Sequence, residues 1–318
     1  MFFVLSGFLI TSLLIDARQE RSYYHDFYWK RALRILPLYL LCLLGVLLFL
    51  PDLRGYVLLS TFFISNFAGL FHVATNGPFW TLAIEEQFYL IWPTVVRRRT
   101  IPQLRHWAIA IGSTAFLLRF IAAAFGHYNY AFTFFRCDGL AFGAFLACWF
   151  VQRNPQTANT SRETRLMSLG VLLGIVCVSL SLLPGLQADS IAFSAAFRQS
   201  GVTLLCGSVI AFLILGTGSR SLSFFRSRLL TFFGLISYAM YMTHLYVLMA
   251  YDHFRGPLHP GDTPSYALRF VAVLGITIVL CVITRYVVEL PAISLRKHVL
   301  ARPAPASPAD PPLPLGRM

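Results

Sequence analysis

Residues 79–93 read FWTLAIEEQFYLIWP, and they place two adjacent carboxylates, Glu85 and Glu86, inside a hydrophobic stretch. An ionised group at the centre of a bilayer costs roughly 2.5–3.5 kcal/mol on insertion scales. Such a group is tolerated where it faces the interior of a helix bundle or a water-filled cavity. The stretch therefore predicts a membrane protein with a polar interior.

The composition of the whole chain supports this interpretation. Of its 318 residues, 57% are hydrophobic and 12% are charged, whereas a soluble domain carries about 25% charged residues. Apolar segments recur at residues 1–15, 35–50, 56–71, 79–96, 107–125, 132–151, 166–184, 201–217, 229–250 and 267–290. A β-barrel would show alternating strands of about ten residues instead. We therefore expect an all-α polytopic membrane protein, a bundle of about ten hydrophobic segments.

The basic residues give the chain a formal charge of +13 and gather in clusters between the apolar segments. Such clusters mark cytoplasmic loops and contact anionic lipids, so we expect membrane lipids as partners and no nucleic acid. The six cysteines lie in apolar segments at irregular spacing, which indicates free thiols rather than a disulfide framework or a metal site. Residues 298–318 are rich in proline, so we expect a disordered cytoplasmic tail after a membrane domain of residues 1–297.

Two basic loops, at 16–34 and 97–105, should both be cytoplasmic. Three apolar segments lie between them, and three full crossings would place the second loop outside. We therefore expect one element within 51–96 to be re-entrant rather than spanning. Polar residues from Ser60 to Asn66 and the break at Asn76-Gly77-Pro78 make this region the candidate. Irregular backbone at membrane depth is tolerated only where it is buried in protein or lines a cavity.

The carboxylate segment carries the first candidate site. On a helix, Thr81, Glu85 and Tyr89 share one face at i, i+4 spacing. Two interpretations remain open. The carboxylates line a reaction chamber, or they are structural and pair with an intramembrane arginine such as Arg119 or Arg136.

A second candidate lies earlier in the chain, at the cytoplasmic mouth of a helix, in the string WKRALRILP at 29–37. Arg31 and Arg34 are i, i+3 neighbours and should project together. Paired guanidinium groups suit a phosphate or pyrophosphate, although an ordinary positive-inside anchor has the same appearance.

Polar residues also mark the last two long apolar segments. Ser237, Tyr241 and His244 recur at i, i+4 and i+7 and would form one stripe on a helix. A histidine there can carry protons or make a hydrogen bond between helices. Arg285 and Glu289 are spaced to form an ion pair at the end of the last helix.

A glycine pair predicts a close helix contact. Gly139 and Gly143 form a small-xxx-small motif that lets two helices approach. The neighbouring Arg136 and Asp138 are two positions apart and do not face each other. Each should find a partner on another element, in a structural role.

Taken together, these strings resemble the bacterial acyltransferase-3 family of integral membrane acyltransferases, which O-acetylate lipopolysaccharide, capsule and other glycans. The resemblance covers about residues 1–297. It runs in family order through FFVLSGFLIT at 2–11, Arg31 and Arg34 with Ile35 and Pro37, WTL…E…QFY…WP at 80–93, Arg136 with DGL at 138–140 and Gly143, ISY…Y…H at 236–244, and ELP at 289–291. No single string is decisive, but their combination in this order is highly specific.

The resemblance implies transfer of an acyl group, usually acetyl, from cytoplasmic acyl-CoA to a hydroxyl of a cell-surface glycan or glycolipid. It implies a multi-pass protein of the bacterial cytoplasmic (inner) membrane, with acetyl-CoA or another acyl-CoA as donor and no metal. It assigns Arg31 and Arg34 to the CoA phosphates, and it places Glu85 in the polar cavity near the reacting groups.

One departure from the family pattern affects the expected chemistry. Family members carry a further helix before the segment that matches residues 2–11, with an arginine and a histidine thought to serve acyl transfer. This sequence begins at that segment, which implies a late start codon, a truncated reading frame or an inactive chain. Without the upstream histidine, His244 or Glu85 would have to act as the base. The rival classes are a transporter or flippase of an amphiphilic glycan intermediate and a scaffold partner in glycan assembly.

Overall fold

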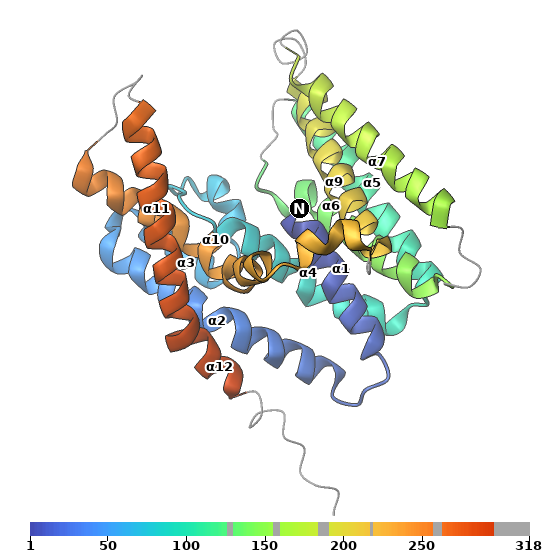
Figure 1. Ribbon diagram of the computed structural model, residues 1–318, viewed down its shortest axis with the longest axis horizontal. Coiled ribbons are helices and arrows are strands. Elements are labelled where there is room, and N and C mark those ends of the chain that lie inside the picture. Colours follow the sequence, from blue (N-terminus) through green and yellow to red (C-terminus); the bar gives the residue numbers. More distant parts are fainter. Residues whose placement is uncertain (126–129, 155–159, 184–190, 217–218, 257–262, 296–318) are drawn as a thin grey trace, which may run out of the picture.

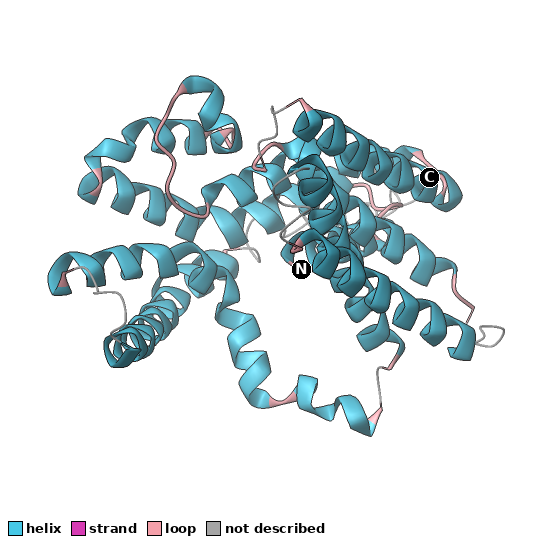
Figure 2. Cartoon of the chain, turned by 90° about the horizontal axis from the view of Figure 1, so that it is seen from above, coloured by secondary structure: helices cyan, strands magenta, loops and turns pink. Residues whose placement is uncertain are grey.

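The computed structural model describes residues 1–125, 130–154, 160–183, 191–216, 219–256 and 263–295, and within these residues all regular structure is helical (Figures 1 and 2). The α-helices are α1 Phe2–Asp16, α2 Tyr23–Phe49, α3 Arg54–Thr61, α4 Phe79–Arg98, α5 Ile101–Ala124, α6 Thr133–Gln152, α7 Thr160–Ser181, α9 Ile191–Leu215, α10 Arg228–Arg255, α11 Thr263–Thr284 and α12 Leu290–Ser294. Short 3-10 segments are η1 Pro51–Leu53, η2 Ser65–Phe71 and η3 Arg220–Arg226, and η4 Arg285–Glu289 is π-helical. The expected all-α fold is confirmed. The tail expected at 298–318 lies outside the described residues.

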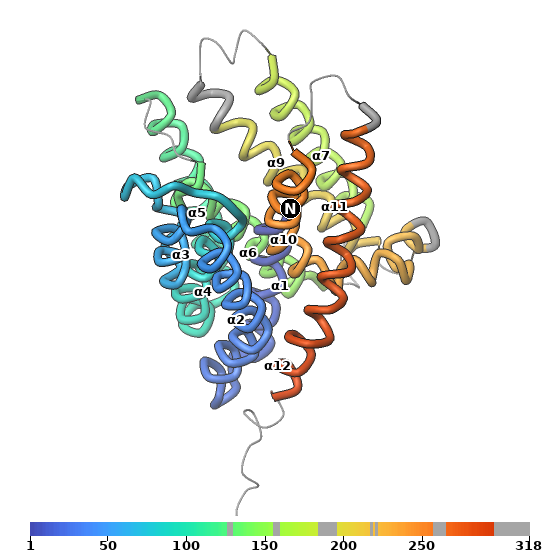
Figure 3. Tube along the Cα trace, turned by 90° about the vertical axis from the view of Figure 1, so that its left-hand side faces the viewer, coloured from blue at the N-terminus to red at the C-terminus, as the bar shows by residue number. Residues whose placement is uncertain are grey.

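Seven helices in the described part of the chain are long and apolar enough to cross a membrane. They are α2, α5, α6, α7, α9, α10 and the stretch Ser265–Ser294, in which α11, η4 and α12 follow one another as one rod (Figure 3). α1 is a shorter apolar helix. α4 has 20 residues, but the polar run from Glu85 to Gln87 lowers its hydropathy. The chain is therefore a multi-pass membrane protein.

The segment between α2 and α4 contains no helix long enough to cross a membrane. α3 has eight residues and η2 has seven, and eight residues of helix rise about 12 Å against a hydrocarbon core of about 30 Å. The two are separated at Phe63, whose φ of 55° is left-handed, a conformation that few aromatic residues adopt. Both elements are too short to span a membrane, in agreement with the expectation of a non-spanning element within 51–96.

The helices form two groups that meet at α4. One group contains α1, α5, α6, α7 and α9, and the other contains α2, α3, α10, α11 and α12 (Figure 1). α4 contributes to the core of both groups. Its Ile84, Tyr89 and Trp92 pack with α1, α5 and α6, while Phe79 and Leu82 pack with α2, α3 and α10. Side chains on α4 are therefore placed between the two groups.

The glycine motif on α6 brings α1 into backbone contact. A Cβ atom added at Gly143 would lie 2.0 Å from the carbonyl oxygen of Val4, and one added at Gly7 would lie 2.0 Å from that of Leu140. Neither site has room for a side chain, so the close approach predicted from Gly139 and Gly143 is confirmed. The contact fixes α1 against α6, and α1 in turn carries a residue of the candidate site.

Candidate active site

α2 is bound to α4 by tyrosines placed around a proline. Pro93 lies inside α4 and has no amide hydrogen, so the carbonyl of Tyr89 loses its helical donor. The Tyr28 hydroxyl of α2 donates to this carbonyl oxygen at 3.2 Å, and lies 3.2 Å from that of Leu90. The Tyr23 hydroxyl donates to the Pro93 carbonyl at 2.9 Å. These bonds hold the first turns of α2 along α4 and thereby position the next residues of α2.

Arg31 of α2 meets both glutamates of α4. Its Nε donates to Glu86 Oε1 at 2.8 Å, and its Nη2 lies 3.6 Å from Glu85 Oε2. Its guanidinium carbon lies 3.6 Å from the centre of the Tyr89 ring. The side chain of Arg31 is 13% exposed and that of Glu85 is 2% exposed. One guanidinium thus stands against two carboxylates at an interface that is almost closed to solvent.

A third helix completes the surroundings of Glu85. The hydroxyls of Ser6 on α1 and Tyr89 on α4 are hydrogen-bonded to each other. Both hydroxyls are also close enough to the Glu85 carboxylate to stabilise its charge. Glu85 Oε1 is buried and has no hydrogen-bond partner among the described residues. We name Arg31, Glu85, Glu86, Tyr89 and Ser6 the carboxylate cluster. It unites the predicted catalytic Glu85 with the predicted CoA-binding Arg31.

The partner that the sequence suggested for Glu85 was wrong. Arg119 pairs instead with Asp138 at 3.0 Å, and it also donates to the carbonyl of Phe135 at 2.6 Å and to Ser200 at 2.8 Å. The salt bridge of Glu85 is to Arg31, which the sequence had assigned to phosphate. The i, i+3 and i, i+4 spacings relate only residues on one helix, so they carry no information about a pair on two different helices.

Arg34 has surroundings that differ from those of Arg31. It is exposed, and α2 packs here against η4 and α12, where the charge of Arg34 acts on Glu289. Glu289 accepts from Arg285 at 3.2 Å, which confirms the ion pair predicted for the last helix. The two arginines that were predicted to project together therefore have different surroundings. Arg31 turns to α4, whereas Arg34 stays at the surface.

His244 lies outside the carboxylate cluster. The side chain is exposed, and its Nδ1 lies 3.1 Å from the Met240 carbonyl oxygen and 2.8 Å from that of Tyr241 on the same helix. Among the described residues, no hydrogen bond or ion pair joins His244 to Glu85. Tyr241, one turn away in the predicted stripe, does reach α4, because its hydroxyl lies 2.8 Å from that of Thr81.

A neutral network on the other face of α4 was not predicted. Gln87 Nε2 donates to the Phe63 carbonyl at 2.7 Å and to Asn66 Oδ1 at 2.9 Å. Asn66 donates to Thr133 at 2.9 Å, and Thr133 donates back to Gln87. The network ties Phe63 and Asn66, in the segment between α3 and α4, to α4 and α6. The adjacency of Gln87 to the glutamate pair was the only signal in the sequence.

The carboxylate cluster has the groups that acyl transfer requires. Oε1 of Glu85 can accept a proton in a site that is almost closed to solvent, and a general base acts within hydrogen-bond distance of the proton it removes. The guanidinium of Arg31 and two hydroxyls surround the same point and can stabilise negative charge that develops during reaction.

Comparison with known proteins identifies the relatives of the chain. The family model described as "Acyltransferase domain" matches residues 1–286. The chain is 39% identical over 113 residues to the putative peptidoglycan O-acetyltransferase YrhL of Bacillus subtilis, and 35% identical over 113 residues to the peptidoglycan O-acetyltransferase OatA of Listeria monocytogenes. It is 36% identical over 114 residues to the O-acetyltransferase OatA of Staphylococcus aureus.

These alignments to single proteins are short. They cover 29% of this chain and 18% of the Bacillus and Listeria proteins, and 30% of this chain and 19% of the Staphylococcus protein. No solved structure matches the chain significantly.

Proposed function

Because this chain belongs to the acyltransferase family whose model covers residues 1–286, we propose that it is a membrane O-acyltransferase. It transfers an acyl group, first of all acetyl, from an acyl-CoA to a hydroxyl of a cell-surface glycan or glycolipid. The names of the relatives support a polysaccharide acceptor, since two of them are called peptidoglycan O-acetyltransferases. The multi-pass fold and the basic loops support a place in the bacterial cytoplasmic membrane.

The observation that carries this proposal is the contact of Arg31 with Glu85 and Glu86. Two carboxylates and a guanidinium meet where α2 lies against α4, with Glu85 buried and Arg31 and Glu86 half-buried. Burial of ionic groups within a membrane protein is costly and marks functional sites. A purely structural pair would need one carboxylate, whereas this site holds two against one guanidinium.

In the proposed reaction Glu85 is the base. It takes the proton of the acceptor hydroxyl while the acceptor oxygen attacks the thioester carbonyl carbon. The new C–O bond forms, the C–S bond breaks, and the proton passes from Glu85 to the departing sulfur of CoA. Arg31, held by Glu86, and the Tyr89 hydroxyl stabilise the oxyanion. His244 is the alternative base, at the distance of one helical turn from Tyr241.

The donor enters from the cytoplasmic side in this proposal. Arg34 is exposed on the α2 helix, one turn beyond Arg31, and it supplies the charge for a CoA phosphate. Arg31 is less exposed and is already paired with carboxylates, so its part is to orient the thioester end of the donor rather than to carry the full charge of a phosphate.

Radiolabelled acetyl-CoA tests the proposal in proteoliposomes that contain the purified chain and a peptidoglycan acceptor. We expect label on the glycan and release of CoA, and a loss of about 10²–10⁴-fold in the Glu85→Gln variant. Glu163→Gln is the matched control, because Glu163 is also paired with an arginine, Arg153, but at the α6–α7 connection. Absence of transfer by the unmodified chain, or equal activity of the two variants, would refute the proposal.

A further inference from the structure

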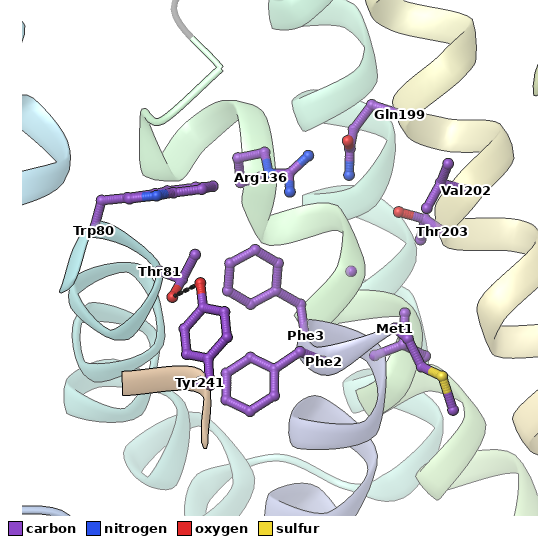
Figure 4. A pocket seen from close by; sticks show the side chains of 12 residues that line it. Met1, Phe2, Phe3, Trp80, Thr81, Arg136, Gln199, Val202, Thr203 and Tyr241 are labelled. Atoms are coloured by element: carbon purple, nitrogen blue, oxygen red, sulfur yellow. Dashed lines mark hydrogen bonds between the residues drawn. The ribbon is translucent and has the colours of Figure 1, made fainter. Parts of the chain in front are cut away.

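A cavity of about 230 Å³ lies at the head of α1 (Figure 4). Five helices line it, namely α1, α4, α6, α9 and α10. Figure 4 shows Arg136, Gln199 and Thr203 on one side, and Trp80, Phe3 and Tyr241 on the other. The cavity is smaller than the roughly 300–1,000 Å³ typical of sites for drug-sized ligands, so it fits a single small ring.

Two helices lead from this cavity to Glu85 within one turn. On α4, Thr81 lines the cavity and Glu85 follows four residues later. On α1, Phe3 lines the cavity, and Ser6, three residues on, is bonded to Tyr89 in the carboxylate cluster. The Tyr241 hydroxyl, bonded to Thr81, is within reach of the charge of Glu85. A ligand in the cavity would thus have its reactive end near the proposed base.

One wall of the cavity is aromatic. The guanidinium carbon of Arg136 lies 5.5 Å from the centre of the Phe3 ring and 5.7 Å from that of Trp80. Trp80 also packs edge-to-face against Tyr130, with ring centres 5.3 Å apart. Phe2 stacks on Tyr241 at 5.7 Å. These contacts hold flat apolar faces around the cavity.

The opposite wall is polar, and buried charged residues bind α9 residues within it and next to it. Thr203 donates to Asp138 Oδ2 at 3.3 Å, and Asp138 is paired with the fully buried Arg119. Arg119 also binds Ser200, the neighbour of Gln199 on α9. The buried Arg119–Asp138 pair, which the proposed reaction does not use, therefore sets the position of the α9 residues that face the cavity.

We propose that this cavity is the acceptor subsite and that it takes one hydroxyl-bearing sugar ring. The apolar face of the ring lies on Trp80, and its hydroxyls face Gln199 and Thr203. Flat aromatic surface combined with a few placed polar groups is the chemistry that a sugar ring requires, because a sugar has C–H faces and a rim of hydroxyls. This inference rests on the proposed acyl transfer and assigns the acceptor to a site.

Its position also suits a two-sided reaction. The cavity surrounds the first residues of α1, whereas the basic loop 16–34 follows the other end of that helix. A 15-residue helix is about 22 Å long. The donor and the acceptor would then approach Glu85 from opposite faces of the membrane protein, without competing for one entrance.

Direct binding tests the inference separately from catalysis. Purified protein in nanodiscs is titrated with the N-acetylglucosamine–N-acetylmuramic acid disaccharide in the absence of acyl-CoA, and binding is followed by saturation-transfer NMR. We expect the Kd to rise about tenfold in Trp80→Ala and in the Gln199→Ala, Thr203→Val double variant, which corresponds to about 1.4 kcal/mol. Trp107→Ala is the control, since Trp107 is exposed on α5 and lies outside the cavity. Trp80→Phe should restore most of the binding if the variant proteins are folded.

Steady-state kinetics give the second measurement. The acceptor KM should rise about tenfold in the cavity variants, while the KM for acetyl-CoA stays within about twofold. Disaccharide binding that is equal in the unmodified protein, the cavity variants and the control would overturn the inference even if acetyl transfer is observed. Transfer that is absent from the unmodified protein refutes the proposed function instead, whatever the binding result.

Discussion

The contact of α1 with α6 and the contact of α2 with α4 hold helices together by different kinds of residue. α1 and α6 meet through glycines, with no room for a Cβ atom at Gly143. α2 and α4 meet through charged and aromatic side chains centred on Arg31. The first contact brings backbone atoms together at the glycines, and its role is to hold the two helices in place. The second leaves acidic oxygens in the interior, and such oxygens have a use only if chemistry or binding occurs there.

The two buried ion pairs show the same contrast. Arg119 and Asp138 are one cation and one anion, and the Nη atoms of Arg119 also donate to a carbonyl and a serine. Arg31 stands against two carboxylates and keeps some exposure. We interpret the first pair as a support for the fold and the second as a working site. The predictions below test this difference.

Asp138→Asn should produce the largest effect on stability. It leaves the buried Arg119 without its counter-charge, and breaking a buried pair of this kind costs about 3–5 kcal/mol. Glu85→Gln should cost much less, because Glu86 still pairs with Arg31. SDS-induced unfolding in mixed micelles measures both. Equal losses in the two variants would remove the distinction between a support and a site.

Gly143→Ala should destabilise the α1–α6 contact. The added methyl group would collide with the Val4 carbonyl oxygen at 2.0 Å, and overpacking of a tight interface costs about 1–3 kcal/mol. Gly112→Ala on α5 is the control, because nothing lies within 4 Å of the new atom and alanine favours the helix. A Gly143→Ala protein as stable as the control would contradict the close approach of the helices.

Arg34→Ala should weaken donor binding with little effect on folding. Loss of one charge-assisted contact to a CoA phosphate raises the KM for acetyl-CoA about tenfold. Arg228→Ala, at an exposed arginine that begins α10, should leave that KM unchanged. If both variants keep the unmodified KM, Arg34 is an ordinary membrane anchor.

Tyr28→Phe should give the smallest effect. It removes the donor to the Tyr89 carbonyl that Pro93 leaves open, at a cost of about 0.5–1.5 kcal/mol. Tyr286→Phe is the control, since Tyr286 is 69% exposed. A stability change confined to Tyr28→Phe, measured by thermal unfolding in detergent, would support the attachment of α2 to α4.

The sequence predicted the fold better than the site, for physical reasons. Hydrophobic length fixes a membrane helix locally, and each expected apolar segment except 56–71 and 267–290 corresponds to one helix. The segment 267–290 runs from α11 through η4 into α12. The division of 56–71 depends on the left-handed backbone at Phe63. An aromatic residue rarely adopts this conformation, so the sequence does not predict it. The loop charges nevertheless predicted a non-spanning element in this region, and the helices found there are short.

Contacts between helices were harder to foresee. The Gly139/Gly143 motif predicted its own contact because small residues act through their shape. The partner of Glu85 lies 54 residues earlier in the chain, at Arg31, and helical spacing carries no information over that distance. His244 was predicted as a substitute for the family's upstream histidine, and the structure places its ring against carbonyl oxygens of its own helix.

The most direct test of the carboxylate cluster is a double-mutant cycle on kcat with Arg31→Gln and Glu85→Gln. Residues that act as one unit are strongly non-additive in kcat. We expect each single variant to lose most of the acetyl-transfer activity and the double variant to be no slower than the slower single variant. Losses that multiply, or a Glu85→Gln enzyme with the unmodified kcat, would show that Arg31 and Glu85 do not form one catalytic site.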